Sequence, residues 1–289
     1  MLVPAQNDLL KQAFLDVSGL KIRYLEAGKG VTANGGTYDK TGKRNVLFIH
    51  GLGSSADRWL DIPDALSLNQ DLHATALDLP GFGLSDKPKI DYTIGEFVKA
   101  VAGFMRDVGI AKASIVGHSL GGYVAAQLAV EHRDLVDKLV LIDSSGMLDR
   151  PTPLLLKYLE AAMNPSREAV RAVFEQLVAD PIRIPEVLVD GFIYRIGQPG
   201  ALHAFKSAFD NSVYTQIGVE KLKQIGENRI STIVIWGMQD NLIPLKHFQV
   251  FQEAIKGSEV VIVEDAGHAP FAEKPAIVSE LLRRFLCKS

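Results

Sequence analysis

The stretch Ala113-Ser114-Ile115-Val116-Gly117-His118-Ser119-Leu120-Gly121 joins a short, β-branched run to an alanine-rich segment. The first part predicts a buried strand, and residues 123–129 predict a helix with a small face that packs on a sheet. Gly-x-Ser-x-Gly between a strand and a helix is typical of a strained turn that exposes the serine hydroxyl. Glycine suits both flanking positions because a Cβ there would collide with neighbouring chain. We therefore predict that Ser119 is a nucleophile.

The two partners that a serine nucleophile needs, a base and an acid, follow later in the chain. The apolar run 233–236 leads into a polar loop that places Asp240 at the carboxyl end of a strand. The run 260–263 leads into another loop, which places His268 at the same edge of a parallel sheet. Serine, aspartate and histidine also occur in the chain order that such a turn requires. We predict that Ser119, Asp240 and His268 are the catalytic residues.

Two backbone amides are suited to stabilise the negative charge that develops on an attacked carbonyl oxygen. The run 46–49 enters the loop His50-Gly51-Leu52-Gly53, whose glycines let it bend toward the serine. Leu120 follows the serine directly. We expect the N–H groups of Leu52 and Leu120 to form an oxyanion hole.

Four motifs, in this order, make the chain resemble the α/β-hydrolase family: the His-Gly loop at 50–53, the serine turn at 117–121, the aspartate loop at 237–241 and the Gly-His loop at 267–268. The resemblance covers nearly the whole chain. It implies an α/β-hydrolase fold, with a mostly parallel eight-stranded sheet flanked by helices, in a serine esterase-like branch. A helical cap would be inserted after the sixth strand, and neither a metal nor an organic cofactor would be required. The segment 78–85 resembles the family's turn after its fourth strand, which is a structural feature.

Asp143 is an alternative acid because it ends the apolar run 139–142, on the strand after the serine helix. Some members of the family carry their acid there. We prefer Asp240, since its loop resembles the family's Gly-x-x-Asp loop and preserves the chain order. Asp143 also leads into the expected cap.

The remaining histidines have weaker claims to a role in catalysis. We expect His50 to brace its loop and His118 to point away from Ser119. His203, in the expected cap, is the one other histidine with a possible contact to substrate. The others are dispersed without the spacing of zinc ligands, so we expect no metal site.

Hydrophobic patterning divides the rest of the chain into a core and an insertion. Runs at 14–17 and 21–26, joined at Ser18-Gly19, predict an antiparallel hairpin, and the polar stretch between Ala27 and Arg44 predicts a surface loop. Six further apolar runs alternate with helical segments, as in a parallel sheet with helices on both faces. They lie near 46–50, 73–78, 113–118, 138–143, 231–236 and 259–264.

Between residues 146 and 224 the strands stop, and six prolines separate short amphipathic helices. We expect this segment to be a helical cap on a core formed by 1–145 and 225–289. Its apolar side chains are expected mostly to pack the cap on the core, and some to roof a substrate pocket. These are Leu154, Leu155, Met163, Phe174, Leu177, Phe192, Phe205 and Phe209.

Composition bounds the class of protein. The 289 residues are 47% hydrophobic and 22% charged, as in a globular α/β protein, and a net charge of -3 offers no electrostatic footprint for nucleic acid. The first twelve residues lack a basic, apolar leader, and no run is long enough to span a membrane, so we expect a cytoplasmic protein. The single cysteine, Cys287, cannot form an internal disulfide. The oligomeric state is left open.

The residues predict a serine hydrolase that cleaves carboxylic esters through an acyl-enzyme. The apolar side chains expected next to the site indicate a small apolar ester with a short or medium acyl chain as substrate. These side chains are Leu52, Leu120, Met238, Leu242 and Phe271. The alternative is hydrolysis of a carbon–carbon bond in ring-cleavage products. Family members with that activity tend to carry asparagine before the serine and tryptophan after the histidine, where this chain has His118 and Ala269. A small-molecule receptor built on the same fold is the alternative from another class.

Overall fold

The computed structural model describes residues 10–27, 44–60, 72–181 and 184–287. Its first element is the predicted hairpin of β1 (Leu10–Val17) and β2 (Leu20–Ala27), which pair antiparallel. Ser18 and Gly19 form the turn with positive φ angles of 54° and 86°. The surface loop expected between Ala27 and Arg44 falls on 28–43, outside the described residues.

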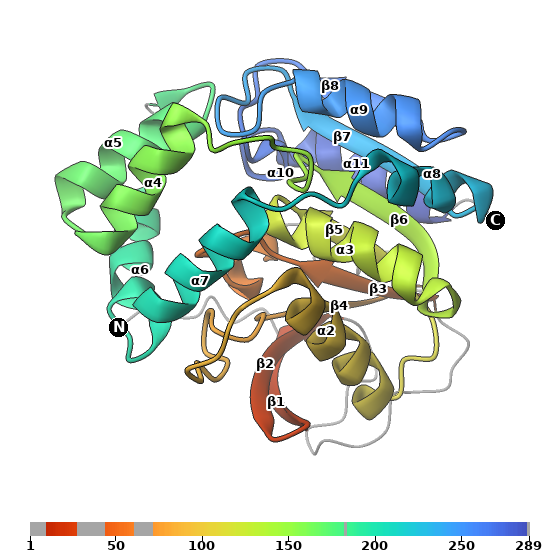
Figure 1. The fold of residues 1–289 in the computed structure, drawn as a ribbon, viewed down its shortest axis with the longest axis horizontal. Helices are drawn as coiled ribbons and strands as arrows, with labels where there is room; N and C mark the ends of the chain where they lie inside the picture. Colours follow the sequence, from red (N-terminus) through yellow and green to blue (C-terminus); the bar gives the residue numbers. More distant parts are fainter. Residues whose placement is uncertain (1–9, 28–43, 61–71, 182–183, 288–289) are drawn as a thin grey trace.

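Eight strands form one sheet in the order β1-β2-β4-β3-β5-β6-β7-β8. β2 pairs antiparallel with β4, and every pairing from β4 to β8 is parallel. The predicted eight-stranded, mostly parallel sheet is thus confirmed, with strand bounds within two residues of the apolar runs (Figure 1). They are β3 (Arg44–Ile49), β4 (Leu72–Leu77), β5 (Ala113–His118), β6 (Val136–Ile142), β7 (Ser231–Gly237) and β8 (Glu259–Val263).

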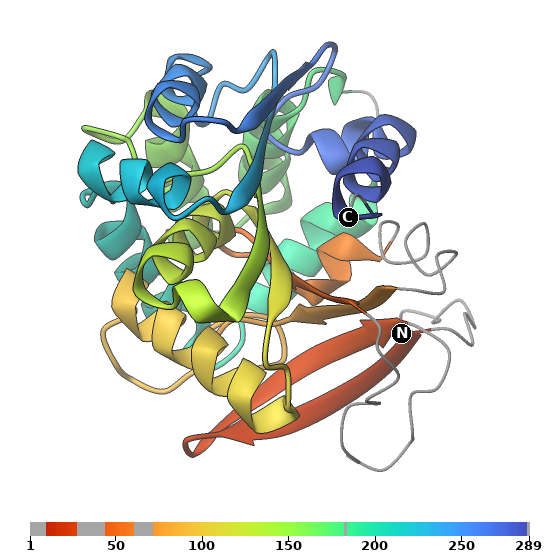
Figure 2. The same cartoon turned by 90° about the vertical axis from the view of Figure 1, so that its right-hand side faces the viewer.

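Helices cover both faces of the sheet, which Figure 2 shows nearly edge-on. One face carries α2 (Ile94–Val108), α3 (Leu120–Glu131), α8 (Val219–Glu227) and α9 (Lys246–Ala254). The other carries the 3-10 turn η1 (Ala56–Trp59), α10 (Pro270–Glu273) and α11 (Pro275–Cys287). A short 3-10 turn, η2 (Arg133–Leu135), leads into β6. Successive strand residues therefore point into two apolar cores: in β3, Leu47 and Ile49 face one, and Val46 and Phe48 face the other.

Four helices lie together beside the sheet, between β6 and α8 in the chain (Figure 1). Local signals set their starts: the Thr152 and Ser166 side chains accept hydrogen bonds from the amides of Leu155 and Ala169, capping the first two helices. α8, which contains residue 224, packs instead on α3 and α9. The four are α4 (Pro153–Met163), α5 (Arg167–Leu177), α6 (Glu186–Ile196) and α7 (Ala201–Val213).

In the part of the chain that the structure describes, none of the helices combines the length and the apolar character needed to cross a bilayer.

Candidate active site

Ser119 occupies a strained turn between β5 and α3, as predicted. Its φ and ψ of 53° and −119° are rare for a residue with a Cβ, and its amide is fixed by a 3.0 Å hydrogen bond to the Ile142 carbonyl. A Cβ on Gly117 would overlap the Gly121 carbonyl, and one on Gly121 would overlap the Ile49 carbonyl. The turn therefore requires glycine on both sides of the serine, and it places Ser119 in the wall of a cavity.

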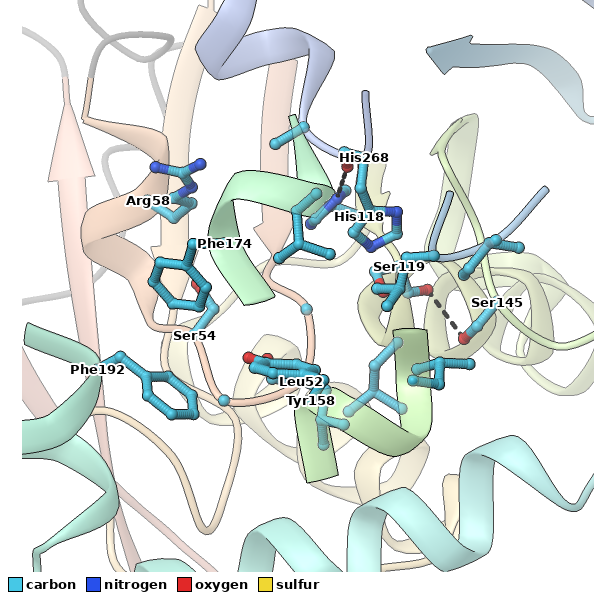
Figure 3. Close-up of a pocket in the computed structure, with 18 of the residues that line it drawn as sticks. Leu52, Ser54, Arg58, His118, Ser119, Ser145, Tyr158, Phe174, Phe192 and His268 are labelled. Atoms are coloured by element: carbon cyan, nitrogen blue, oxygen red, sulfur yellow. Dashed lines mark hydrogen bonds between the residues drawn. The ribbon is translucent and has the colours of Figure 1, made fainter. Parts of the chain in front are cut away.

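His268 and Asp240 meet at the same edge of the sheet. The His268 Nδ1 lies 2.8 Å from the Asp240 Oδ2, and both side chains are buried. The other Asp240 oxygen accepts hydrogen bonds from the amides of Leu242 and Ile243 at 2.8 and 3.0 Å. Because a carboxylate accepts, Nδ1 carries the proton of the imidazole, which leaves Nε2 as the acceptor nitrogen. His268 lines the same cavity as Ser119 (Figure 3).

The loop that carries His268 is fixed from two directions. Its His268 amide donates to the Leu177 carbonyl, at the end of α5, over 2.7 Å. The Glu273 carboxylate accepts from the amide of Gly267 at 2.9 Å and, through its second oxygen, from the amide of Ala179 at 2.7 Å. The histidine loop and the end of α5 thus share a hydrogen-bonded junction.

His118, which we expected to point away from Ser119, packs against His268. Its Nε2 is 2.7 Å from the His268 carbonyl oxygen, its ring centroid is 4.8 Å from the His268 ring, and it lines the cavity (Figure 3). Burial, followed by the neighbouring His268, holds the pKa of His118 well below its usual value. His118 is therefore a neutral ring whose Nε2–H donates to the His268 backbone.

His50 braces its loop, as expected. Its Nε2 accepts from the Leu79 amide at 3.0 Å, so Nδ1 donates to the Gly51 carbonyl at 2.8 Å. His203 lies apart from the site, since its Nε2 is bonded to the Ile90 carbonyl and it does not contribute to the described cavity lining.

Both residues predicted to supply oxyanion-hole amides, Leu52 and Leu120, line the cavity. Leu120 is the first residue of α3, so its N–H has no acceptor within the helix. The Leu52 carbonyl accepts a 3.0 Å hydrogen bond from the Tyr158 hydroxyl of α4, a contact that no sequence motif signals. Tyr158 thereby ties the His-Gly loop to the helices beside the sheet.

The cavity encloses about 140 Å³ and is predominantly apolar. Of the site neighbours named from the sequence, Leu52, Leu120 and Leu242 line it, whereas Met238 and Phe271 do not. Met238 is 47% exposed, and the buried Phe271 ring stacks on Trp59 and lies 4.9 Å from the ring of His118. Phe205 and Phe209 belong to the core, and Met163 is 36% exposed and does not line the cavity. The wall facing Ser119 comes from α4 to α6 and the segments between them, namely Leu155, Tyr158, Phe174, Leu177, Val178, Ile184, Leu188 and Phe192.

Two arginines in the cavity wall, Arg58 and Arg195, were not predicted from the sequence. Arg195 of α6 donates from Nε to the Gly53 carbonyl at 3.4 Å, and burial lowers the pKa of its guanidinium. In the sequence Arg195 stands near the end of a mostly apolar helical stretch, and no pattern there marks it as a cavity residue.

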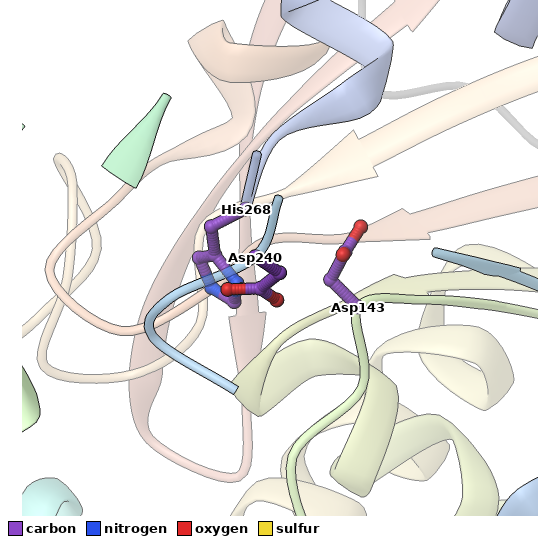
Figure 4. A group of neighbouring side chains, drawn as sticks. All are labelled: Asp143, Asp240 and His268. Carbon is purple, nitrogen blue, oxygen red and sulfur yellow. The ribbon is translucent and has the colours of Figure 1, made fainter. Parts of the chain in front are cut away.

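Asp143, the alternative acid, lies on the far side of Asp240 from His268 (Figure 4). Its Oδ1 accepts from the Gly237 amide at 2.9 Å, and its Oδ2 is buried without a partner. One donor atom from each of the three side chains lies within 4.8 Å of the others. The Asp240 carboxylate is already bonded to His268 Nδ1 and to the amides of Leu242 and Ile243, so these three side chains offer fewer free donor atoms than the four of a structural zinc site.

Comparison with known proteins gives consistent matches. Residues 44–275 match the family model described as alpha/beta hydrolase fold. The dihydrolipoyllysine-residue acetyltransferase component of the acetoin cleaving system of Cupriavidus necator is 31% identical over 277 residues, which cover 94% of this chain and 68% of that protein. The 2-hydroxy-6-oxo-6-(2'-aminophenyl)hexa-2,4-dienoic acid hydrolase of Metapseudomonas resinovorans is 26% identical over 285 residues, covering 96% and 91%. A solved bacterial membrane phospholipase A is 27% identical, with a TM-score of 0.80 over 96% of this chain and 86% of that chain.

Proposed function

Because this chain belongs to the α/β-hydrolase fold family, we propose that it is a serine hydrolase that cleaves carboxylic esters with short or medium acyl chains. The observation that carries the proposal is that Ser119, on its strained turn, and His268, held by Asp240, line one apolar cavity. A nucleophile, a base and an oriented acid are the parts that acyl transfer needs.

In the proposed reaction the Ser119 hydroxyl attacks the ester carbonyl while His268 Nε2 accepts its proton. His268 then donates that proton to the leaving alcohol, and water, activated by the same nitrogen, hydrolyses the acyl-enzyme. Asp240 stays ionised and keeps the Nδ1 proton in place. The amides of Leu52 and Leu120 stabilise the oxyanion, and loss of one such donor typically costs about a hundredfold or more in rate.

We propose that α4 to α7, within the segment 146–224, act as a cap that closes the acyl-binding side of this cavity. Their side chains supply most of its apolar lining, including Leu155, Phe174 and Phe192. The cavity volume of about 140 Å³ is close to that of an engineered protein cavity, roughly 150 Å³, that binds benzene. A short acyl chain or a single ring therefore fits without rearrangement. The likeness to a phospholipase, an ester hydrolase, supports the same bond type.

The second candidate is hydrolysis of a carbon–carbon bond in a dienoate. Arg195 favours it, because a desolvated guanidinium in an apolar wall is suited to a substrate carboxylate. The relative from Metapseudomonas resinovorans acts on such an acid by its name. His118 and Ala269, at positions where family members with this activity tend to carry asparagine and tryptophan, count against it.

A single panel of assays tests these candidates. Aryl esters from acetate to decanoate, and a coloured dienoate, are offered to the wild type and to Ser119→Ala, with folding checked by circular dichroism. Ester turnover that peaks at short or medium chains and disappears in Ser119→Ala supports the proposal. Dienoate turnover that exceeds ester turnover, and falls in Arg195→Met, would assign the second candidate.

If the folded wild type turns over neither class, the receptor alternative gains support. Retained ester turnover in Ser119→Ala would require another nucleophile.

A further inference from the structure

We propose that Asp143 is a neutral carboxylic acid whose Oδ2 hydroxyl donates a hydrogen bond to the Asp240 carboxylate, making Asp143 a positioning residue for the acid of the site. The inference rests on the proposed function only for its catalytic consequence. The protonation state itself is a property of the folded chain.

The surroundings of Asp143 disfavour a charge. The side chain is fully buried, and its Oδ1 accepts a hydrogen bond from the Gly237 amide at 2.9 Å. The Oδ2 atom is buried and accepts no hydrogen bond, and one oxygen of the Asp143 carboxyl group lies within 4.8 Å of an Asp240 oxygen and of a His268 ring nitrogen (Figure 4). A buried carboxylate with one amide donor and a second carboxylate beside it retains its proton, because burial and like charge both disfavour ionisation.

The charged groups around Asp143 act in the same direction. Asp240 lies beside it on the loop after β7, and the Glu273 carboxylate of α10 adds a second negative charge. His268 is the nearby base, and its Nδ1 is already engaged by Asp240. Burial first, and then the charge of Asp240, raise the pKa of Asp143 well above its usual value.

A proton on Asp143 completes the hydrogen bonding of both acids. Asp240 already accepts from Leu242, Ile243 and His268, and a donor on its remaining side would hold the carboxylate ionised and in place. The other oxygen of Asp143 fixes the Gly237 amide, and the Gly237 carbonyl accepts from the Asp240 amide at 3.2 Å. One side chain thus holds both the loop and the carboxylate that orients His268.

Asp143→Asn is the variant that separates the protonation states. Its amide is nearly the same shape as a neutral carboxylic acid, keeps a donor and an acceptor, and asparagine tolerates the positive φ of 43° at this position. Asp143→Ser removes the reach to Asp240 while remaining polar. Asp143→Asn mimics the proposed protonated side chain, and Asp143→Ser removes its hydrogen bond to Asp240.

The decisive measurement is the unfolding equilibrium of wild type and Asp143→Asn between pH 4 and pH 7. An unfolded aspartate ionises near pH 3.9, whereas a neutral folded Asp143 does not. The unfolded wild type is then favoured as the pH rises, and its unfolding constant should increase relative to that of Asp143→Asn by up to tenfold per pH unit. A constant ratio, or one that changes in the opposite direction, would overturn the proposal.

An infrared difference spectrum supplies an independent readout that needs no activity. At pH 7 the wild type should show a protonated-carboxyl C=O band that Asp143→Asn lacks, and absence of the band would contradict a neutral Asp143.

If ester turnover is present, Asp143→Asn should keep the acid limb of its pH profile, while Asp143→Ser should lose kcat with little change in KM. If the wild type turns over no ester, the proposed function fails while the unfolding and infrared results still decide the state of Asp143.

Discussion

The two sides of the cavity are built in different ways. On the sheet side, backbone fixes the residues: the carbonyls of Ile49 and Gly121 leave no space for a Cβ in the serine turn, and two amides hold Asp240. On the helical side, side chains make the surface, with Tyr158, Phe174 and Phe192 in mutual ring contact at centroid distances of 5.5 to 6.4 Å. The first side tolerates almost no change of shape, whereas the second can be remodelled one side chain at a time.

This difference predicts that substitutions on the sheet side cause the largest losses of kcat. Asp240→Asn should lower kcat for an ester by about 10⁴-fold, because an amide at this position favours the wrong tautomer of His268. The variant should fold, since asparagine has the same size. Kinetics at saturating ester measure the loss. Asp265→Asn is the matched control, because that residue is exposed on the histidine loop, and it should change kcat less than twofold. Equal effects of the two changes would remove Asp240 from the proposed mechanism.

Adding a methyl group to the serine turn should destabilise the folded protein. Gly121→Ala places a Cβ on the Ile49 carbonyl and should lower the free energy of unfolding by about 3 kcal/mol. Gly95→Ala is the control, since the nearest atom to its Cβ is the Thr93 hydroxyl at 3.8 Å and alanine favours the helix α2. Denaturant titration of both proteins distinguishes them. A Gly121→Ala protein as stable as the wild type would show that the turn can relax.

Changes on the helical side should alter selectivity instead. Phe174→Ala enlarges the cavity and should shift the ratio of kcat/KM for long over short acyl esters by about tenfold, the value of one to two methylenes in an apolar pocket. Phe209→Ala removes a core ring that does not line the cavity, so it should cost stability and leave this ratio unchanged. A similar shift in both variants would show that the acyl-chain preference depends on the stability of the helical side and not on the shape of the cavity.

The smallest expected effect lies where the two sides touch. Tyr158→Phe removes the hydroxyl that donates to the Leu52 carbonyl, one hydrogen bond worth about 1 kcal/mol, and should lower kcat about fivefold. Tyr194→Phe, an exposed change on α6, should have no effect. The pair is compared by kcat for one ester at fixed pH. No difference between them would mean that the His-Gly loop keeps its shape without the helices.

The sequence predicted the sheet side because its signals are local. Glycines around Ser119, and loops that follow β-branched runs, specify where strands end and which residues appear there. The contacts of Arg195 and Tyr158 depend on how α4 and α6 cross the sheet edge, and amphipathic patterns do not encode that crossing. For the same reason the sequence did not separate Leu242, which lines the cavity, from Met238, which is 47% exposed, and Phe271, whose ring packs on Trp59 and His118 outside the lining.

The junction between α5 and the histidine loop limits how this protein can admit a ligand. The Leu177 carbonyl holds the His268 amide, Glu273 bridges the same two segments, and a Cβ on Gly267 would overlap Leu177. An outward movement of α5 at this junction would break these bonds and remove the contacts that fix the loop carrying His268. A ligand that entered without opening this junction would leave the contact between His268 and Asp240 in place.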